Sequence, residues 1–145
     1  MASITSTNST YILTIPGVFP IPQVLQGYAT DAAFDTDQSQ NAEVVMGVDG
    51  KMSAGYVPFI TNQTIHLQAD SLSVFLFEAW LAAEKAINEK LFAIGVITLP
   101  SVRRTYTLRD GVLTSSNPIA SVQRTLQPRD FTISWGSIDP VPFGA

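Results

Sequence analysis

The most informative part of this sequence is NAEVVMGVDGKMSAGYVP (residues 41–58), followed by QTIHLQAD (63–70) and SLSVFLFEAWLAAEKAINEK (71–90). It predicts a β-hairpin, a further strand and one amphipathic helix in close succession. This order is typical of a small sheet with a single helix packed on it. The stretch holds no recognisable catalytic cluster, which favours a building block or a binding module over an enzyme.

The register of the predicted hairpin follows from its side chains. A three-residue loop, Val48 to Gly50, sets apolar residues opposite apolar residues, whereas a two-residue turn at Asp49 and Gly50 mixes apolar with polar. Because a slip of one residue moves every side chain to the opposite face, we expect the matched register. Gly50 then takes the left-handed position of a type I turn with a bulge, where glycine has no steric penalty. The facing pairs are Met46–Met52, Val44–Ala54 and Ala42–Tyr56, and the other face carries Glu43, Gly47, Lys51, Ser53 and Gly55, with Val45 as its large apolar exception.

The strand after the hairpin runs directly into the helix. Residues 64–69 alternate between polar and apolar, with His66 on the polar face. Asp70 or Ser71 supplies a side-chain oxygen to cap the first free amides of the helix. We expect the helix over about 71–90, with one buried stripe at helical spacing. The residues of this stripe are Leu72, Phe75, Leu76, Ala79, Trp80, Ala83 and Ile87.

The rest of the chain reads mainly as strands. Strand patterns occupy residues 11–15, 24–29, 92–99, 102–109, 112–115, 121–126 and 131–138, separated by turn signals such as Asp110-Gly111. Pro20 and Pro22 allow only extended or edge structure, and the polar residues 30–40 are expected to form a loop. The predicted fold class is mainly β with one helix: two packed sheets, a β-sandwich or partly open barrel, flanked by the helix. Residues 1–10 are expected to be a flexible arm and residues 11–145 a single domain.

The composition restricts the function. Eight Lys and Arg against twelve Asp and Glu give a net charge of −4, which argues against binding nucleic acid through its phosphates. The absence of cysteine excludes disulfides, thiolate metal sites and cysteine nucleophiles. No run approaches the roughly 20 apolar residues that span a membrane, and the sequence MASITSTNST lacks the features of a signal peptide.

The charge is unevenly divided. Residues 1–72 carry six acids and one lysine, whereas residues 73–145 carry six acids and seven basic residues. Such asymmetry favours head-to-tail association between identical subunits, as in rings and filaments. The alternative is that each charge simply solvates its own loop.

No reactive constellation stands out. His66 is the single histidine, so a site with two histidines is impossible, and Asp31, Asp35 and Asp37 lack the spacing of an EF-hand. We expect no catalytic residue, no metal and no cofactor. Arg103 and Arg104 point to opposite faces of a strand and form no clamp. Trp80 reads as a core residue, and Trp135 as core or interface, with core favoured.

The order of features resembles the tail tube proteins of contractile-tailed bacteriophages. It is similar in particular to a short tube-protein family with the pattern GxDGxxxxG followed by TxxLQxxS and a helix. The resemblance extends from about residue 27 to the C-terminus and includes the acidic loop GYATDAAFDTD (27–37) and FTISWGSI (131–138). The matching positions are Gly47, Asp49, Gly50, Gly55, Thr64, Leu67, Gln68 and Ser71.

The resemblance implies a structural subunit without enzymatic activity. Such subunits form hexameric rings that stack into a DNA-conducting tube inside the sheath, and one sheet from each subunit closes a continuous inner barrel. The implied partners are further copies of the chain and the sheath, baseplate and neck proteins. Viral DNA would pass without specific binding, and no membrane is involved. The implied location is the virion tail, after synthesis in the host cytoplasm.

The resemblance also implies roles for particular residues. The hairpin (41–57) and the arm (2–10) would make the ring-to-ring contacts. The stacking residues would be Met46, Gly47, Val48, Asp49, Gly50, Lys51 and Met52, and the lumen-facing ones Glu43, Lys51 and Ser53.

Two other functions stay open at this point. The first is a single ring of the same fold that initiates or terminates the tube at the baseplate or neck. The second is a small β-sandwich that binds a carbohydrate or peptide through exposed aromatic residues such as Tyr11, Tyr28, Phe34 or Tyr106.

Overall fold

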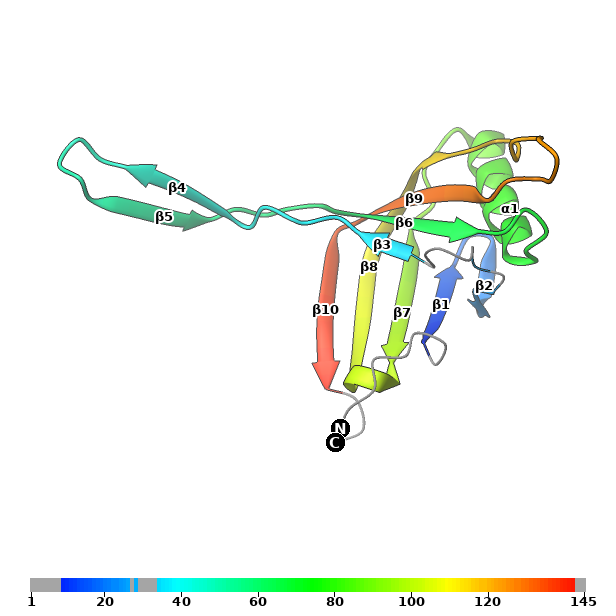
Figure 1. Cartoon of the computed structure of the whole chain (residues 1–145), viewed down its shortest axis with the longest axis horizontal. Helices are drawn as coiled ribbons and strands as arrows, with labels where there is room; N and C mark the ends of the chain where they lie inside the picture. Colours follow the sequence, from blue (N-terminus) through cyan, green and yellow to red (C-terminus); the bar gives the residue numbers. More distant parts are fainter. Residues whose placement is uncertain (1–8, 27, 29–33, 143–145) are drawn as a thin grey trace.

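The computed structural model describes residues 9–26, 28 and 34–142. These residues form a series of strands, one long α-helix and a short 3₁₀ helix (Figure 1). In chain order they are β1 (Thr10–Ile15), β2 (Phe19–Val24), β3 (Phe34–Thr36), β4 (Ala42–Met46), β5 (Met52–Tyr56), β6 (Thr61–Leu67), α1 (Ser73–Ile87), β7 (Ala93–Leu99), the 3₁₀ helix η2 (Pro100–Val102), β8 (Arg104–Ser116), β9 (Arg129–Trp135) and β10 (Ser137–Pro142).

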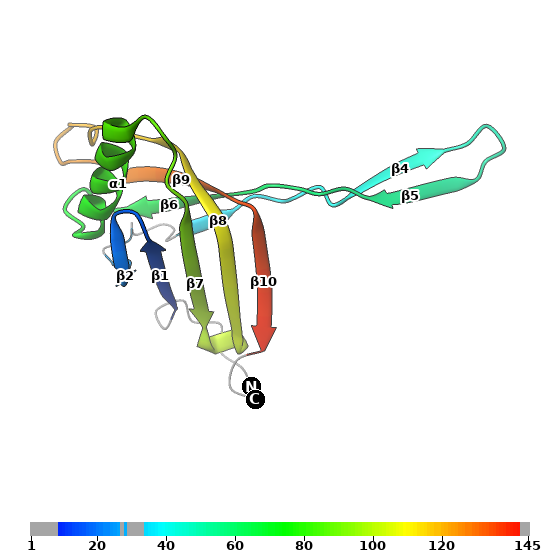
Figure 2. The ribbon, with the colours of Figure 1, turned by 180° about the vertical axis from the view of Figure 1, so that it is seen from behind.

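Two antiparallel sheets form the body and share the long strand β8 (Figures 1 and 2). The first sheet has the order β2-β1-β7-β8-β10, and the second has the order β8-β9-β6-β3. Helix α1 covers one end of the space between them. The predicted class, mainly β with two sheets and one flanking helix, is confirmed, and the sheets do not close into a barrel.

Strand β8 passes from one sheet to the other at the point where sequence reasoning expected a turn. Asp110 adopts a left-handed conformation, with φ of 56°, but the strand continues through it. The ring of Trp135 occupies the space that a side chain at position 111 would fill, so glycine fits there without a clash. The bulge bends the strand, and the two predicted strands at 102–109 and 112–115 are therefore one.

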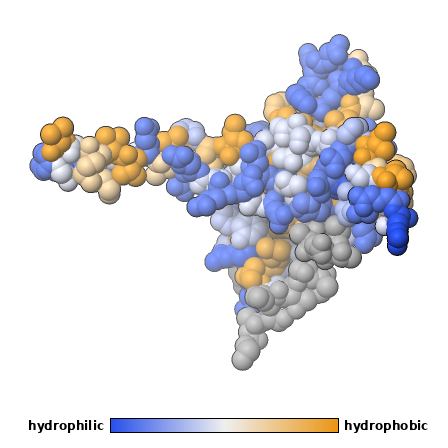
Figure 3. All heavy atoms as spheres, turned by 45° about the horizontal axis from the view of Figure 1, so that its top comes forward, coloured by the Kyte–Doolittle hydropathy of each residue, from blue (hydrophilic) through white to orange (hydrophobic). Residues whose placement is uncertain are grey.

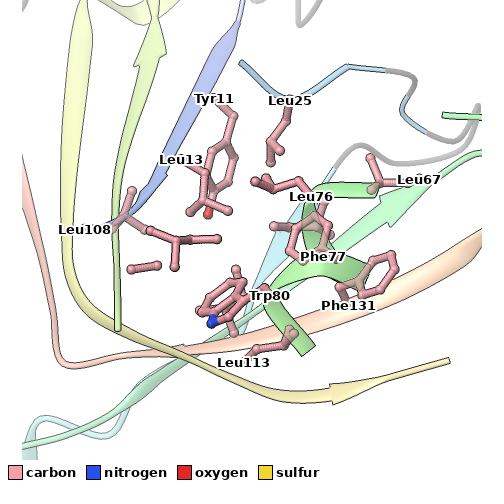
Figure 4. Close-up of a cluster of buried hydrophobic side chains, with 14 of the residues drawn as sticks. Tyr11, Leu13, Leu25, Leu67, Leu76, Phe77, Trp80, Leu108, Leu113 and Phe131 are labelled. Atoms are coloured by element: carbon pink, nitrogen blue, oxygen red, sulfur yellow. The ribbon is translucent and has the colours of Figure 1, made fainter. Parts of the chain in front are cut away.

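The core lies between the two sheets and α1 (Figure 4). Phe77 of the helix stacks on Phe131 of β9, with ring centroids 4.4 Å apart. Trp80 and Trp135 are both fully buried, as expected. Within this apolar core, the Gln63 side-chain oxygen accepts hydrogen bonds from the Tyr11 hydroxyl and the Trp135 indole. Because the Tyr11 hydroxyl and the Trp135 indole N–H are both hydrogen-bonded, burying these rings leaves neither donor unsatisfied.

The buried face of α1 differs from the predicted stripe. Leu72 and Phe75 are each 65% exposed and Ile87 is 51% exposed, whereas Val74 and Phe77 are buried. The helix carries apolar residues on more than one face, and the face with Val74, Phe77 and Trp80 enters the core. The prediction was therefore wrong for Leu72, Phe75 and Ile87.

The start and end of α1 also differ from the prediction. The N-cap position is Leu72, one or two residues beyond the predicted Asp70 or Ser71, and it has no side-chain capping bond. The side-chain oxygen of Ser71 accepts a hydrogen bond at 3.2 Å from the amide of Ser73, the first residue of the helix, which is the contact predicted for it. The helix ends at Ile87 and not near residue 90, because Asn88 adopts a left-handed conformation.

Other boundaries shift as well. Residues 34–36 form the short strand β3 inside the expected loop, and residues 121–126 lie in an exposed loop with a single isolated bridge. The strand expected at 131–138 is two strands, β9 and β10, which belong to different sheets. Most of the predicted arm, residues 1–8, lies outside the described residues, as do Asp31 and part of the strand expected at 24–29. Within the described ranges, no helix has the length and apolarity that crossing a membrane requires.

Candidate interaction site: a projecting hairpin

Strands β4 and β5 form a separate two-stranded sheet that projects far from the body (Figures 1 and 2). Every residue of both strands is exposed. The expectation that this hairpin belongs to the same sheet as β6 was wrong, because the connecting residues 37–41 and 57–60 carry it away from the body.

The predicted register of the hairpin is confirmed. Met46 faces Met52, Val44 faces Ala54 and Ala42 faces Tyr56. The loop closes with a hydrogen bond from the Gly47 amide to the Lys51 carbonyl at 2.8 Å, and Gly50 has φ of 83°. Asp49 accepts a hydrogen bond from the Lys51 amide at 3.1 Å. The local sequence therefore specifies the tip of the hairpin without any contact to the body.

The hairpin exposes large apolar side chains along its length (Figure 3). An isolated two-stranded hairpin is marginally stable in water, and a contiguous exposed apolar surface marks an interaction site. The exposed large apolar residues of the hairpin and its connection to β6 are Val44, Val45, Met46, Val48, Met52, Tyr56, Phe59 and Ile60. This arrangement can bind the apolar surface of another chain.

The residues predicted to face a lumen share one side of this hairpin. Glu43 pairs with Gly55 and Ser53 pairs with Val45, so both lie on the side opposite the methionines. Lys51 lies at the tip. The structure brings these three residues onto the projecting element, away from the faces of the two body sheets.

A charged cluster fastens the root of the hairpin to the body. His66 on β6 places Nδ1 2.6 Å from Oδ1 of Asp130 on β9, and Nε2 2.9 Å from Oδ2 of Asp35 on β3. Burial alone lowers the pKa of His66, but the hydrogen bonds and negative charges of Asp130 and Asp35 outweigh it and raise the pKa. Both ring nitrogens of a protonated histidine donate, so the charged form satisfies both carboxylates.

Two further contacts hold the chain where it leaves the body. The Asp37 amide donates to the Asn62 carbonyl at 2.8 Å, and the Ser39 and Thr61 hydroxyls lie 2.8 Å apart. Sequence reasoning missed this root, because its residues come from three strands. The one available signal was that His66 and Asp130 occupy polar positions of alternating strands.

A second exposed apolar surface is held rigidly by a buried arginine. Arg129 donates hydrogen bonds to Glu78 on α1 at 2.6 Å and to the Asn117 carbonyl at 2.8 Å, and it lies over the Phe131 ring. These contacts fix the loop of residues 117–128 against the helix. The exposed apolar residues of this loop are Ile119, Val122 and Leu126.

The residues weighed for metal or small-ligand binding can be located in the structure. None of their histidine, aspartate and glutamate side chains gather in a group of three able to hold a metal ion. Tyr11 is buried, and Tyr28, Phe34 and Tyr106 pack against the core. Of the four aromatic residues considered for binding a carbohydrate or peptide, one is therefore fully buried and three are partly buried.

The comparisons with known proteins agree with this architecture. A family model described as tail fiber protein gp32 matches residues 2–139. The chain matches no curated protein by sequence.

Three solved structures share its fold. A chain of the six-fold symmetrised anti-feeding prophage baseplate matches with a TM-score of 0.65 at 8% identity, covering 100% of this chain and 99% of its own. A chain of the tube-terminating cap of the anti-feeding prophage matches with a TM-score of 0.58 at 12% identity, covering 98% and 93%. A chain of the sheath/tube terminator of an extracellular contractile injection system, PVC, matches with a TM-score of 0.54 at 14% identity, covering 90% and 92%.

Proposed function

We propose, from the premise that this chain belongs to the tail fiber protein gp32 family, that it is a non-enzymatic structural subunit of a bacteriophage tail. Six copies would form a ring, and rings would stack into a tube that conducts viral DNA inside the sheath. The shared fold with a chain of a six-fold symmetrised baseplate supports this ring. The partners would be further copies and the sheath, baseplate and neck proteins, within the virion.

The observation that carries the proposal is the projecting apolar hairpin. A chain that keeps its body well packed but exposes Val44, Met46 and Met52 on a long arm needs another surface to cover them. Six copies in a ring present six such arms in one direction, so the next ring offers the matching surface. The tip residues 46–52 would then make the ring-to-ring contact. Glu43 and Ser53, and the tip residue Lys51 at the edge of that contact, would border the channel.

The wall of the channel would come from the first sheet. Its outward face pairs Ile12 with Val96 and Val96 with Thr107. The charged residues on this face of β8 and β10 are Arg109 and Asp139, one of each sign. A lining without a basic surface does not hold phosphates by counterion release, so a polyanion slides past it. The threonines of this face are Thr10, Thr14, Thr98, Thr105 and Thr107.

A second candidate function has specific support. The three solved structures come from a baseplate, a tube-terminating cap and a sheath/tube terminator, positions where a ring ends or begins a tube. The chain would then form one ring that stacks on a single side. The distinction lies in whether rings add to rings without limit.

Negative-stain electron microscopy of the concentrated protein tests the proposal. Hollow filaments with six-fold end views would support the tube subunit, and isolated rings would support the initiator or terminator. A protein that stays monomeric at high concentration in every salt would overturn both. A matched variant in which a Gly-Ser turn replaces residues 42–56 should keep the body fold and give rings that do not stack.

A further inference from the structure

The side of helix α1 that faces away from the core is apolar. Leu72, directly before the helix, and Phe75 in its first turn are each 65% exposed within the described part of the chain. Helical spacing places four alanines on the same side, one to four turns further along, and none of them is buried. These alanines are Ala79, Ala82, Ala83 and Ala86. We call the six residues the outward α1 face.

A hollow next to this face enlarges the apolar surface. It has a volume of about 190 Å³, lies between β2 and α1, and is lined in part by Val24, Leu72 and Phe75. Val24 is 58% exposed, so it extends the apolar surface from the helix onto the edge strand. A contiguous exposed patch of this kind marks an interaction site.

One side of the projecting hairpin matches this face in chemistry and length. The three pairs Met46–Met52, Val44–Ala54 and Ala42–Tyr56 place six apolar, exposed side chains on that side. The paired strands are about 17 Å long, and the outward α1 face is about 21 Å long. Methionine adapts its shape to irregular gaps, so Met46 or Met52 can fill the hollow beside the helix.

The charges beside the two surfaces are complementary. The hairpin, residues 42–56, carries two acids and one lysine, so its net charge is negative. Both acids of α1 are paired with basic residues from outside the helix, at 2.6 Å and 3.5 Å. Among the described residues this leaves Lys85 as the charge of the helix without an ion pair. The exposed charge beside the outward α1 face is therefore positive.

A hairpin cannot reach the helix of its own chain. The hairpin and α1 lie at opposite ends of the long axis of the molecule (Figures 1 and 2). A contact between them therefore needs two copies, with the hairpin of one meeting the helix of the other. Such a head-to-tail contact uses two different surfaces and can repeat from copy to copy.

We propose that the hairpin of one copy lies with its apolar side on the outward α1 face of another copy, with a methionine in the hollow beside β2. This inference rests on the proposed function, because it names the surface that receives the stacking hairpin. The opposite side of the hairpin, with Glu43 and Ser53, is left uncovered by this contact.

Two variants test the proposal by removing one side of the contact each. Leu72→Glu/Phe75→Glu places two charges on the receiving face, at exposed sites where the body should keep its fold. In the second variant a Gly-Ser turn replaces residues 42–56. We expect each variant alone to associate only at a concentration at least about tenfold higher than the natural chain, because a charge buried against apolar surface is costly. Sedimentation velocity measures this. Ile119→Glu/Val122→Glu, at similarly exposed apolar sites in the loop before β9, is the matched control and should associate as the natural chain does.

Mixing the two variants tests the pairing itself. One variant keeps the hairpin and the other keeps the outward α1 face, so the mixture restores one complete contact. We expect it to form complexes larger than those of either variant alone. Complexes no larger than those of the separate variants would overturn the proposal. So would Leu72→Glu/Phe75→Glu that associates like the natural chain.

The same measurements separate this proposal from the proposed function. If the natural chain forms no rings or tubes, the proposed function fails, yet larger complexes in the mixture would still support the contact between hairpin and helix. Natural tubes, with no gain in the mixture, would overturn the contact alone. If circular dichroism shows that Leu72→Glu/Phe75→Glu is unfolded, Ala82→Glu/Ala86→Glu replaces it, because both alanines are exposed on the same face.

Discussion

The hairpin β4–β5 and the strand β6 follow each other in the chain and obey the same alternation, yet one buries nothing and the other is half buried. In β6 the buried positions alternate strictly with open ones, whereas every residue of β4 and β5 is exposed. The apolar residues of β6 have partners inside this chain, because Phe131 on the neighbouring strand β9 and residues of the helix belong to the same buried cluster. Those of the hairpin remain exposed within the described part of the chain. The alternation of residues thus specifies which side of a strand is apolar. The topology of the chain determines whether the same molecule or another one covers that side.

We expect the largest difference in the free energy of unfolding between a substitution in the core and one in the hairpin. Phe77→Ala removes a fully buried ring that stacks on Phe131, and should lower the free energy of unfolding by about 3–5 kcal/mol. Met46→Ala should change it by no more than about 0.5 kcal/mol, because the side chain is exposed. Urea unfolding followed by tryptophan fluorescence measures both. A loss above about 2 kcal/mol for Met46→Ala would show that the hairpin packs on its own body.

A smaller effect is expected within the hairpin itself. Gly50→Val places a β-branched residue at φ of 83°, which costs on the order of 1–3 kcal/mol, and the cost falls on the hairpin alone. Gly55→Val is the control, because both sites have open space around the added side chain but Gly55 has no positive φ. We expect both variants to keep the body fold, and Gly50→Val alone to impair stacking in electron micrographs. Normal tubes from Gly50→Val would contradict the role of the turn.

These two regions also explain what could be predicted from the sequence. The register of the hairpin followed from local pairing, and nothing else in the molecule competes with it. Trp80 was assigned to the core because it lies at the helical spacing of the apolar stripe, and for Trp135 the core was favoured over an interface; both are buried. Asp110-Gly111 was read as a turn, since the bulge in β8 depends on Trp135, a residue distant in the sequence. Local signals fail where a distant side chain decides the backbone.

The buried face of the helix and the root of the hairpin were not predicted correctly, for related reasons. Leu72 and Phe75 are apolar but exposed, so helical spacing alone could not select the buried face. Asp35, His66 and Asp130 lie on three strands, and their meeting depends on the order β9-β6-β3, which no short motif encodes. The candidate site was therefore predicted at its tip and missed at its root.

The charged cluster at the root of the hairpin should make the free energy of unfolding depend moderately on pH. The folded-state pKa of His66 is raised above its ordinary value of 6.5, so its contribution to stability is fully present below pH 6.5 and is lost as the pH rises through the raised value. We expect urea midpoints to fall as the pH rises from 6.5 through the raised pKa of His66. His66→Gln should remove that part of the pH dependence, and Asp35→Asn should reduce it. A profile unchanged by His66→Gln would show that the two carboxylates do not depend on the histidine charge.

The smallest effect on stability, with the most specific effect on function, is expected for Glu43→Lys. Glu43 is exposed on the polar side of the hairpin, so the free energy of unfolding should change by no more than about 0.5 kcal/mol. If this side borders the channel, the added positive charge would hold phosphates and slow DNA ejection, with a stronger effect at low salt. Ser53→Asn, on the same side, is the uncharged control. Ejection that is equally fast in both variants at low salt would remove Glu43 from the channel wall and leave the hairpin as a stacking element alone.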